Sequence, residues 1–475
     1  MLLVMLGMAV GTGNIWRFPR IAATNGGGTF LIPWAIFLLA WSVPLLLVEF
    51  AMGKASRRGP VGAFATLIGG SWAWMGAWIA LCATFIMFYY SVVTGWCLRY
   101  LAATVTGEIP ASEPGALWES YAGSGWAVLT MAISLGLGVW VVAGGIRWIE
   151  KAARVMMPTL LVLVVILAIR AVTLPGAERG LAFLFTPDFS ALGNSRVWLE
   201  ALTQNAWDTG AGWGLALTYA TYMRAREDTT VNAFVLGFGN NSISLLAGIM
   251  VLCTVFSIMP DAAAQITGAG NEGLTFIWVP QLFETMVGGR FFMLIFFAAL
   301  FFAAWTSTIS MVELVTRTLQ DLGMPRRRAL GLISVLALLL GIPSALNRSM
   351  FLNQDFVWGV GLMVSGLFFA LAVLKFGVTR FRETLVNGSH SDIRIGAWWD
   401  WAIRLVVVQA AVLVVWWLWQ VRADVWGPEG PGPTLVQWAV ALTAFLLLNN
   451  TLVRLINAHV DREVEPDTQP IVSIP

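Results

Sequence analysis

The sequence predicts an all-α integral membrane protein with about twelve transmembrane helices, of which the first and the sixth are broken. The 475 residues are 58% hydrophobic and only 11% charged, whereas soluble domains are about 25% charged. Long apolar segments recur along the chain, and glycine clusters interrupt two of them. This composition excludes a soluble enzyme, a disordered chain and a coiled coil, and a net charge of +2 gives no sign of a nucleic-acid partner.

The apolar segments set the number of spans, because a spanning helix needs about 20 mostly apolar residues. Many of the 25 tryptophans lie near segment ends, as in an interfacial aromatic belt. The expected spans are 1–20, 29–52, 73–103, 126–145, 153–173, 197–223, 231–259, 290–320, 329–346, 354–376, 402–421 and 434–458.

Basic residues indicate the orientation, because cytoplasmic loops are rich in Lys and Arg. Clusters follow alternate spans, and the opposite loops carry acidic residues instead. The clusters are Lys54/Arg57/Arg58, Arg147/Lys151/Arg154, Arg224/Arg226, Arg326/Arg327/Arg328 and Lys375/Arg380/Arg382. With twelve spans, this alternation predicts that both termini are cytoplasmic.

The glycine clusters lie at similar places in two successive sets of five spans. The first span contains GMAVGTGN over 7–14, and the sixth contains DTGAGWG over 208–214. Interrupted helices in corresponding positions indicate an inverted-repeat transporter with a mid-membrane site, because freed backbone groups must be satisfied by ions, substrate or protein. Close helix packing would explain one such cluster, but two clusters flanked by Asn14 and Asp208 favour a binding site.

Seven motifs occur in an order that resembles the neurotransmitter:sodium symporter family, in its bacterial amino-acid transporter branch. They are GMAVGTGNIWRFP (7–19), NGGGTFLIPW (25–34), VEFAMGK (48–54), MPTL (157–160), FTPDF (185–189), GLALTYATYMR (214–224) and LFFAAWTSTIS (300–310). The resemblance implies a LeuT-type 5+5 inverted repeat with broken helices 1 and 6 and two extra C-terminal helices. It also implies sodium-driven uptake by alternating access, in the bacterial inner membrane, rather than catalysis.

This fold divides the chain into five expected parts. They are a first repeat over 1–173, an extracellular connection over 174–196, a second repeat over 197–376, helices 11 and 12 over 402–458, and a cytoplasmic tail over 459–475. The resemblance leaves the oligomeric state open between monomer and dimer.

The resemblance also implies two sodium sites. The positions that match the first site are Ala9, Asn14, Asp208 and Asn240, with the substrate carboxylate completing the shell. The positions that match the second are Gly7, Val10, Ala303, Thr306 and Ser307. The alternative for the Thr-Ser pair is hydrogen bonding to carbonyls one turn earlier in its own helix.

Asp208 departs from the family, most of whose members carry Ser or Thr there. An ionisable residue inside a membrane is a functional hypothesis by default. The positions that match the chloride region of chloride-dependent relatives are Trp34, Gln204, Asp208 and Ser244. We expect Asp208 to supply the fixed negative charge, so that chloride is not required. The alternatives are a proton carried by Asp208 on the return step, or a helix cap at the break.

The substrate pocket matches positions on helices 1, 3, 6 and 8. Monoamine carriers of the family hold their amine with an Asp on helix 1, where this chain has Gly11. We therefore expect a small neutral, apolar amino acid that brings its own carboxylate; the alternative is an amine or amino-acid derivative. The expected pocket residues are Ala9, Gly11, Thr12, Gly13, Ile86, Tyr90, Trp207, Asp208, Gly210, Trp213, Thr306 and Met311.

Two gates follow from the same resemblance. Arg17 and Asp355 match the external gate, joined by the Trp207 lid, and Tyr222 and Asp321 match half of the inner gate. The family's partner Arg for the inner gate precedes helix 1, and the chain begins at Met1. We therefore expect either an earlier start or a weakened inner gate.

Glu49, inside the second span, is expected to cap the unwound backbone of helix 6.

Two other classes of protein compete with a symporter. An aspartyl intramembrane protease needs a second membrane Asp in a GxGD motif, and a serine protease of this kind needs GxSG with a His; the sequence contains neither pattern. A nontransporting sensor that binds an amino acid in the same site stays open.

Overall fold

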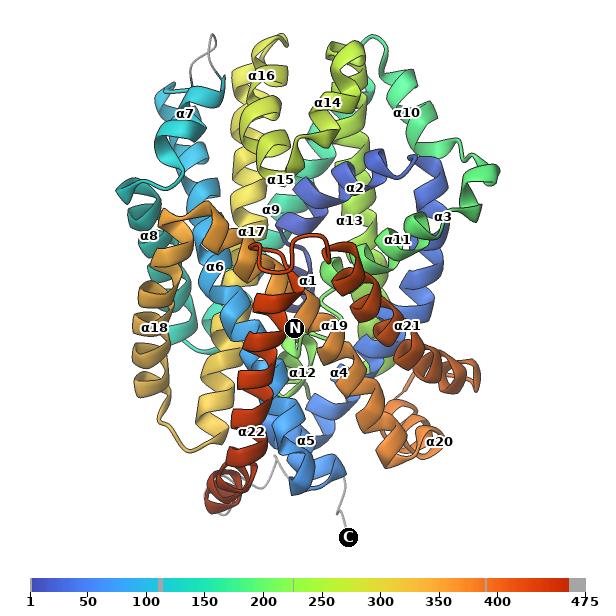
Figure 1. The fold of residues 1–475 in the computed structure, drawn as a ribbon, viewed down its shortest axis with the longest axis vertical. Helices are drawn as coiled ribbons and strands as arrows, with labels where there is room; N and C mark the ends of the chain where they lie inside the picture. The colour runs from blue at the N-terminus through green and yellow to red at the C-terminus, as the bar shows by residue number, and fades with distance from the viewer. Residues whose placement is uncertain (1, 110–113, 225, 389–390, 461–475) are drawn as a thin grey trace.

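The computed structural model describes residues 2–109, 114–224, 226–388 and 391–460, and these residues form helices and connecting loops without a β-strand (Figure 1). The predicted cytoplasmic tail lies almost entirely outside the described residues, as does Met1. The α-helices are α1 (Leu2–Ala9), α2 (Phe18–Thr24), α3 (Gly28–Phe37), α4 (Val43–Ser56), α5 (Pro60–Ile68), α6 (Ala73–Thr106), α7 (Pro114–Tyr121), α8 (Gly125–Ala143), α9 (Ile146–Val172), α10 (Ala177–Phe185), α11 (Ser195–Asp208), α12 (Leu215–Ala220), α13 (Thr229–Ile258), α14 (Ala263–Gly268), α15 (Gly270–Glu272), α16 (Val279–Glu284), α17 (Gly289–Asp321), α18 (Arg326–Leu346), α19 (Arg348–Phe376), α20 (Val378–Phe381), α21 (Trp398–Gln420) and α22 (Pro431–Val460).

Ten helical segments of the described chain are long and apolar enough to cross a membrane. The first and sixth predicted spans are the interrupted segments α1–α2 and α11–α12, which complete the set of twelve. Several helices start earlier than the hydropathy pattern predicts: α9 begins at Ile146 rather than 153, and α19 begins at Arg348 rather than 354. Their first turns carry polar or charged residues beyond the apolar stretch, so hydropathy alone cannot place these starts.

The short helices gather at the two ends of the bundle. Figure 1 shows α7, α10, α14 and α16 at one end, whereas α5 and α20 lie at the other. The basic clusters Lys54/Arg57/Arg58 and Lys375/Arg380/Arg382 lie beside α5 and α20, so the sequence predicts that this end is cytoplasmic. We refer to it by that prediction as the cytoplasmic end, and to the opposite one as the outer end.

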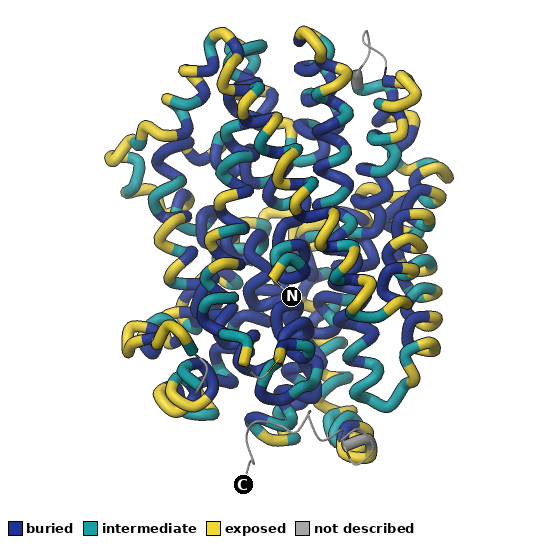
Figure 2. Tube along the Cα trace, turned by 180° about the vertical axis from the view of Figure 1, so that it is seen from behind, coloured by how far each residue is buried: buried dark blue, intermediate teal, exposed yellow. Residues whose placement is uncertain are grey.

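The interior of the bundle is buried, and exposed positions lie on its periphery (Figure 2). Trp41, Trp78 and Trp399 are fully buried, whereas Trp401 and Leu447 on the outside are 72% and 78% exposed. Large apolar side chains facing outward on long helices are what a lipid environment permits. The exterior therefore suits a bilayer, and the polar residues of the site are enclosed within it.

The two interrupted helices differ in how they are broken. α1 ends at Ala9, the Val10 N–H still bonds to the Leu6 carbonyl at 2.8 Å, and a π-helical turn begins at Gly13. The first break is therefore shorter than the predicted 7–14. The second break runs from Thr209 to Gly214, and three of its glycines have φ between 70° and 89°, a region open mainly to glycine.

Glu49 closes the second break from α4. Its Oε1 accepts the Gly212 N–H at 2.7 Å and its Oε2 accepts the Leu217 N–H at 3.1 Å. This contact confirms the predicted cap. A buried carboxylate in this position replaces the hydrogen bonds that the unwound backbone would otherwise lack.

Candidate functional site

Asn14 ties the first break to α13. Its Oδ1 accepts the Gly11 N–H at 2.8 Å, and its Nδ2 lies 2.8 Å from both Asn240 Oδ1 and Ser244 Oγ. All of these groups are buried. Helix 1 is thus held open by a side chain that also reaches two polar residues one turn apart on α13.

Oxygen atoms from three elements meet beside Asn14. Asn240 Oδ1, which accepts the hydrogen bond from Asn14, also lies 3.3 Å from the Ala9 carbonyl oxygen and 3.0 Å from the Asp208 carbonyl oxygen. Facing oxygens at these distances are stabilised either by a hydrogen from a rotated Asn240 amide or by a cation. The structure therefore brings together all four residues predicted for the first sodium site.

The carboxyl group of Asp208 lies at the same place. Its Oδ2 accepts a hydrogen bond from Ser244 Oγ at 2.5 Å. Its Oδ1 is buried and has no hydrogen-bond partner within the described part of the chain. A Cβ added at Gly13 would lie 3.0 Å from this oxygen, so the carboxylate faces the helix 1 break. Hard cations bind carboxylate and carbonyl oxygens, and the residues present fit a sodium ion.

The residues of the second predicted sodium site lie where α1 passes α17. A Cβ added at Gly7 would lie 3.5 Å from Thr306 Cβ, and one added at Gly11 would lie 2.9 Å from Ser307 Oγ. Both hydroxyls donate to the Ala303 carbonyl, at 3.1 and 3.2 Å. Both hydroxyls therefore have hydrogen-bond acceptors within their own helix, and sodium binding there stays a prediction.

Tyr90 meets the first break from α6. Its hydroxyl lies 3.1 Å from both the Thr12 N–H and the Thr12 Oγ1. A backbone N–H at a helix start beside a tyrosine hydroxyl is a good binding position for an anionic group. The predicted carboxylate-binding residues are thus adjacent.

A cavity of about 320 Å³ joins these groups to the outer end of the bundle. It is lined by ten of the twelve predicted pocket residues, whereas Ile86 and Thr306 are not part of its lining. Val93, Leu215 and Val360 line the cavity as well. The sequence carried no signal for these three, because an aliphatic side chain on a buried helix looks the same whether it faces a neighbour or a cavity.

Trp207, the predicted lid, lines the cavity. The Arg17 guanidinium stacks 5.3 Å from its ring, and Trp213 packs edge-on at 5.9 Å. A Cβ added at Gly359 would lie 2.0 Å from Trp207 Cζ2, so this glycine makes room for the lid. Arg17 and Asp355 line the same cavity, but among the described residues no ion pair joins them.

The predicted former chloride region is buried and retains unpaired polar atoms. The Trp34 indole N–H and both polar atoms of the Gln204 side chain are buried, with no hydrogen-bond partner among the residues described. Trp34 packs on Phe18 with ring centroids 4.7 Å apart. Ser244, which could otherwise donate to an anion, donates to Asp208.

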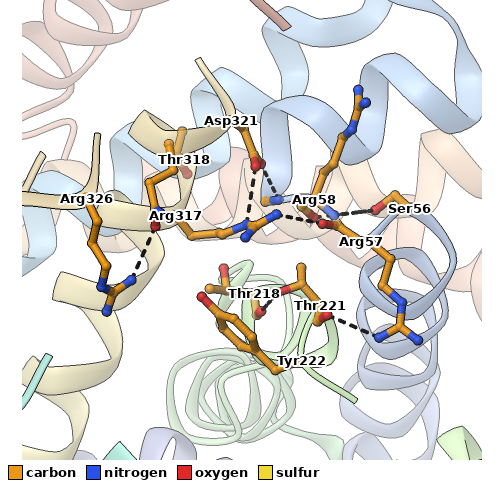
Figure 3. Close-up of polar contacts among 12 residues, drawn as sticks. Ser56, Arg57, Arg58, Thr218, Thr221, Tyr222, Arg317, Thr318, Asp321 and Arg326 are labelled. Carbon is orange, nitrogen blue, oxygen red and sulfur yellow. Dashed lines mark hydrogen bonds and ion pairs between the residues drawn. The ribbon is translucent and has the colours of Figure 1, made fainter. Parts of the chain in front are cut away.

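The predicted inner-gate residues lie at the cytoplasmic end of the bundle and contact different partners. The Tyr222 hydroxyl donates to Glu313 at 2.6 Å, and Glu313 pairs with Arg326 at 2.6 Å. Sequence reasoning missed Glu313, although an acid within the apolar segment 290–320 was a usable signal. Asp321 pairs with Arg317 at 3.2 Å, as Figure 3 shows.

Two interrupted helices that surround a mid-membrane site define a membrane transporter of the inverted-repeat class. The family model described as the Sodium:neurotransmitter symporter family matches residues 1–124 and 116–457. The chain belongs to this family and is a sodium-dependent symporter rather than an enzyme.

Named relatives and a solved structure agree with this assignment. An uncharacterized sodium-dependent transporter of Methanocaldococcus jannaschii is 33% identical over 429 residues, which cover 85% of this chain and 86% of the relative. An uncharacterized sodium-dependent transporter of Bacillus subtilis is 32% identical over 432 residues, which cover 86% of this chain and 93% of the relative. The crystal structure of MhsT in complex with L-phenylalanine matches with a TM-score of 0.75 at 30% identity and covers 87% of this chain and 96% of that chain. This likeness confirms the predicted LeuT-type fold.

Proposed function

We propose that the protein imports a small neutral, apolar amino acid together with sodium, by alternating access across a bacterial inner membrane, with both termini in the cytoplasm. The observation that carries the proposal is the meeting of Asn14, Asn240 and Asp208 at the first helix break, with a carboxylate oxygen left unpaired. A bound sodium ion would supply the positive charge that these oxygens need.

The helix 1 break supports a substrate that carries its own carboxylate. A side chain at Gly11 would meet Ser307 Oγ at 2.9 Å and the Tyr90 hydroxyl at 3.1 Å, which leaves no room for an acid that could hold an amine. The Thr12 N–H and the Tyr90 hydroxyl instead offer donors to a carboxylate.

The wall of the cavity supports an apolar side chain. Trp213, Met311, Val93 and Leu215 line it beside the two breaks. Contact with such a wall favours apolar groups by about 25 cal/mol per Å² buried. MhsT was crystallised with L-phenylalanine, and we extend this kind of substrate to the present chain.

Asp208 is proposed to replace chloride. Its carboxylate accepts a hydrogen bond from Ser244 and faces the helix 1 break at Gly13, while its main-chain carbonyl oxygen lies 3.0 Å from the Asn240 side chain. A negative charge fixed on this carboxylate would therefore lie beside a bound cation. Trp34 presents an indole N–H in place of the hydroxyl usual in chloride-dependent relatives, and its ring is packed on Phe18. A second anion beside a buried carboxylate would be repelled.

Uptake into proteoliposomes tests the proposal. An inward sodium gradient should drive accumulation of labelled apolar amino acids, equally well with chloride or gluconate outside. Asp208→Ser should make uptake require chloride, and Asp400→Asn, a buried carboxylate on α21 away from the cavity, should leave the chloride response unchanged. Sodium-dependent binding without accumulation or counterflow would identify a sensor, and chloride-dependent uptake by the parent protein would refute the role of Asp208.

A further inference from the structure

The first turns of α9 carry three exposed cations on one face of the helix. Arg147, Lys151 and Arg154 are all exposed, and a helix turns about 100° per residue, so that they share an arc of about 60°. The same face continues into Val162 and Ile169, which are 55% and 57% exposed. The cations therefore lie on the face of α9 that the bilayer covers further along the helix.

The depth of these cations matches the headgroup layer of a membrane. The apolar stretch of this span starts near residue 153, whereas α9 begins at Ile146. The extra helix is about 10 Å long at 1.5 Å per residue, and a headgroup layer is about 5–8 Å thick. Trp140 and Trp148 at the same corner are 60% and 43% exposed and pack edge to face at 5.3 Å, and Trp is enriched at the membrane–water interface.

The first turn of α18 brings two more exposed cations to this corner. α8 packs against both α9 and α18, and α8 and α18 lie at the edge of the bundle (Figure 1). Arg326 Nη2 donates to the Val142 carbonyl at 2.7 Å, which holds the start of α18 against the end of α8. Arg327 and Arg328 follow and are exposed, and Val335, on the same face as Arg328, is 54% exposed. We call five residues the basic corner: Arg147, Lys151, Arg154, Arg327 and Arg328.

The charge of the basic corner is not balanced from within the protein. None of its five side chains makes a hydrogen bond or an ion pair within the described part of the chain. Of the acids nearby, Glu313 is fully buried and pairs with Arg326, and Glu150 is half-buried. Both helices also begin without a side-chain cap and without an acid in the first turn, where cations oppose the helix dipole. An anion from outside the chain would offset this repulsion.

We propose that the basic corner binds the headgroup of an anionic phospholipid at the cytoplasmic end, with its acyl chains along the exposed apolar face of α9. Guanidinium and ammonium groups form charged hydrogen bonds with phosphate oxygens, and basic residues beside a membrane attract anionic lipids. A free phosphate ion would use the cations alone, whereas a lipid also covers Val162 and Ile169. The inference goes beyond transport and depends neither on the substrate nor on the sodium sites.

Native mass spectrometry of the full-length protein in a neutral detergent tests the site without using transport. The protein is titrated with phosphatidylglycerol or with phosphatidylcholine that has the same acyl chains, and the fraction that retains lipid gives an apparent dissociation constant. Phosphatidylglycerol should bind about tenfold more tightly or better, because only its headgroup carries a net negative charge. Its binding should weaken as the salt concentration rises, because salt screens exposed charges.

The triple variant Arg147→Gln/Lys151→Gln/Arg154→Gln should raise the dissociation constant for phosphatidylglycerol about tenfold or more, because each basic residue beside an anionic headgroup contributes several-fold to affinity. Binding of phosphatidylcholine should change little. The matched control is a second triple variant that removes the same charge from exposed arginines in or next to the outer loops, on α10, α11 and α17. It is Arg179→Gln/Arg196→Gln/Arg290→Gln, and it should keep the parent affinity.

Three results would overturn the lipid site. They are equal retention of the two lipids by the parent protein, an equal loss of affinity in the two triple variants, and displacement of phosphatidylglycerol by millimolar inorganic phosphate at constant ionic strength, which would identify a phosphate-ion site instead. If the α9 variant does not fold, as judged by size-exclusion chromatography, Arg327→Gln/Arg328→Gln decides in its place. The same weakening is expected there, and an unchanged affinity would refute the proposal.

Discussion

Glu49→Gln should destabilise the second helix break. Glu49 is fully buried, and its two oxygens accept the Gly212 and Leu217 N–H groups at 2.7 and 3.1 Å. Glutamine keeps one acceptor but turns an amide NH₂ towards the other N–H. The change removes a hydrogen bond to a charged group, which contributes about 1.5–3 kcal/mol, and leaves a buried donor unpaired, which costs about 1–3 kcal/mol. We expect a loss of about 3–5 kcal/mol.

This loss should appear in the sodium response as well as in stability, because the break lies beside the proposed sodium site and lines the cavity. If the break is less ordered in the variant, part of the free energy of sodium binding must be used to order it, which lowers the apparent affinity for sodium. Thermal unfolding in detergent, followed over a series of NaCl concentrations with choline chloride holding ionic strength constant, measures both effects. The unfolding midpoint should fall, and the sodium concentration for half-maximal stabilisation should rise.

Asp400→Asn provides the matched control for this prediction. Asp400 is a buried carboxylate with two partners, Thr379 at 3.0 Å and Arg382 at 2.9 Å, and it lies outside the cavity lining. Its loss should lower the unfolding midpoint and leave the sodium response unchanged. A Glu49→Gln protein with the parent midpoint and sodium dependence would refute the reasoning.

Three further changes probe the lid, the carboxylate position and an outer ion pair. Gly359→Ala places a Cβ 2.0 Å from the Trp207 ring, so substrate binding should weaken roughly tenfold or more. Adding Trp207→Phe to the Gly359→Ala protein should restore part of the lost affinity, as a double-mutant cycle of binding constants would show. Tyr90→Phe should raise the dissociation constant about tenfold for amino acids, and much less for their amides, because only the carboxylate loses a charged hydrogen bond. Burial raises the pKa of Glu272 above its usual 4.5, although the positive charge of Arg348 at 2.8 Å acts in the opposite direction. The contribution of Glu272 to stability should therefore be full below pH 4.5 and should fall as pH rises through the raised pKa. Glu272→Gln should remove this part of the pH dependence of the unfolding midpoint.

The sequence alone could supply most of the fold, for a physical reason. A bilayer demands long apolar helices and tolerates unwound backbone only at protected sites, so composition and two glycine clusters were enough to predict twelve spans and two breaks. Glu49 could be predicted as a cap because a carboxylate at this depth needs donors. Helix starts such as Ile146 and Arg348 could not be predicted, because polar residues in the first turn give no hydropathy signal.

The site could be predicted in part. Asn14, Asp208 and Asn240 were identified through motifs, and the structure places them together. Arg17 and Asp355, the predicted external gate, line one cavity. The described residues show no ion pair between them, because pairing depends on side-chain geometry that a sequence motif does not contain.

What the sequence by itself determined is therefore the number of spans, the two breaks and the presence of ionisable residues such as Glu49 and Asp208 inside the membrane, because each follows from local composition in a solvent that penalises charge. Only the tertiary structure decided which groups those residues meet: Arg57 with the end of α12, Tyr222 with Glu313, and Trp207 with the space left by Gly359. These contacts join positions 91 or more residues apart, and they depend on how packed helices align their side chains, which no local pattern encodes.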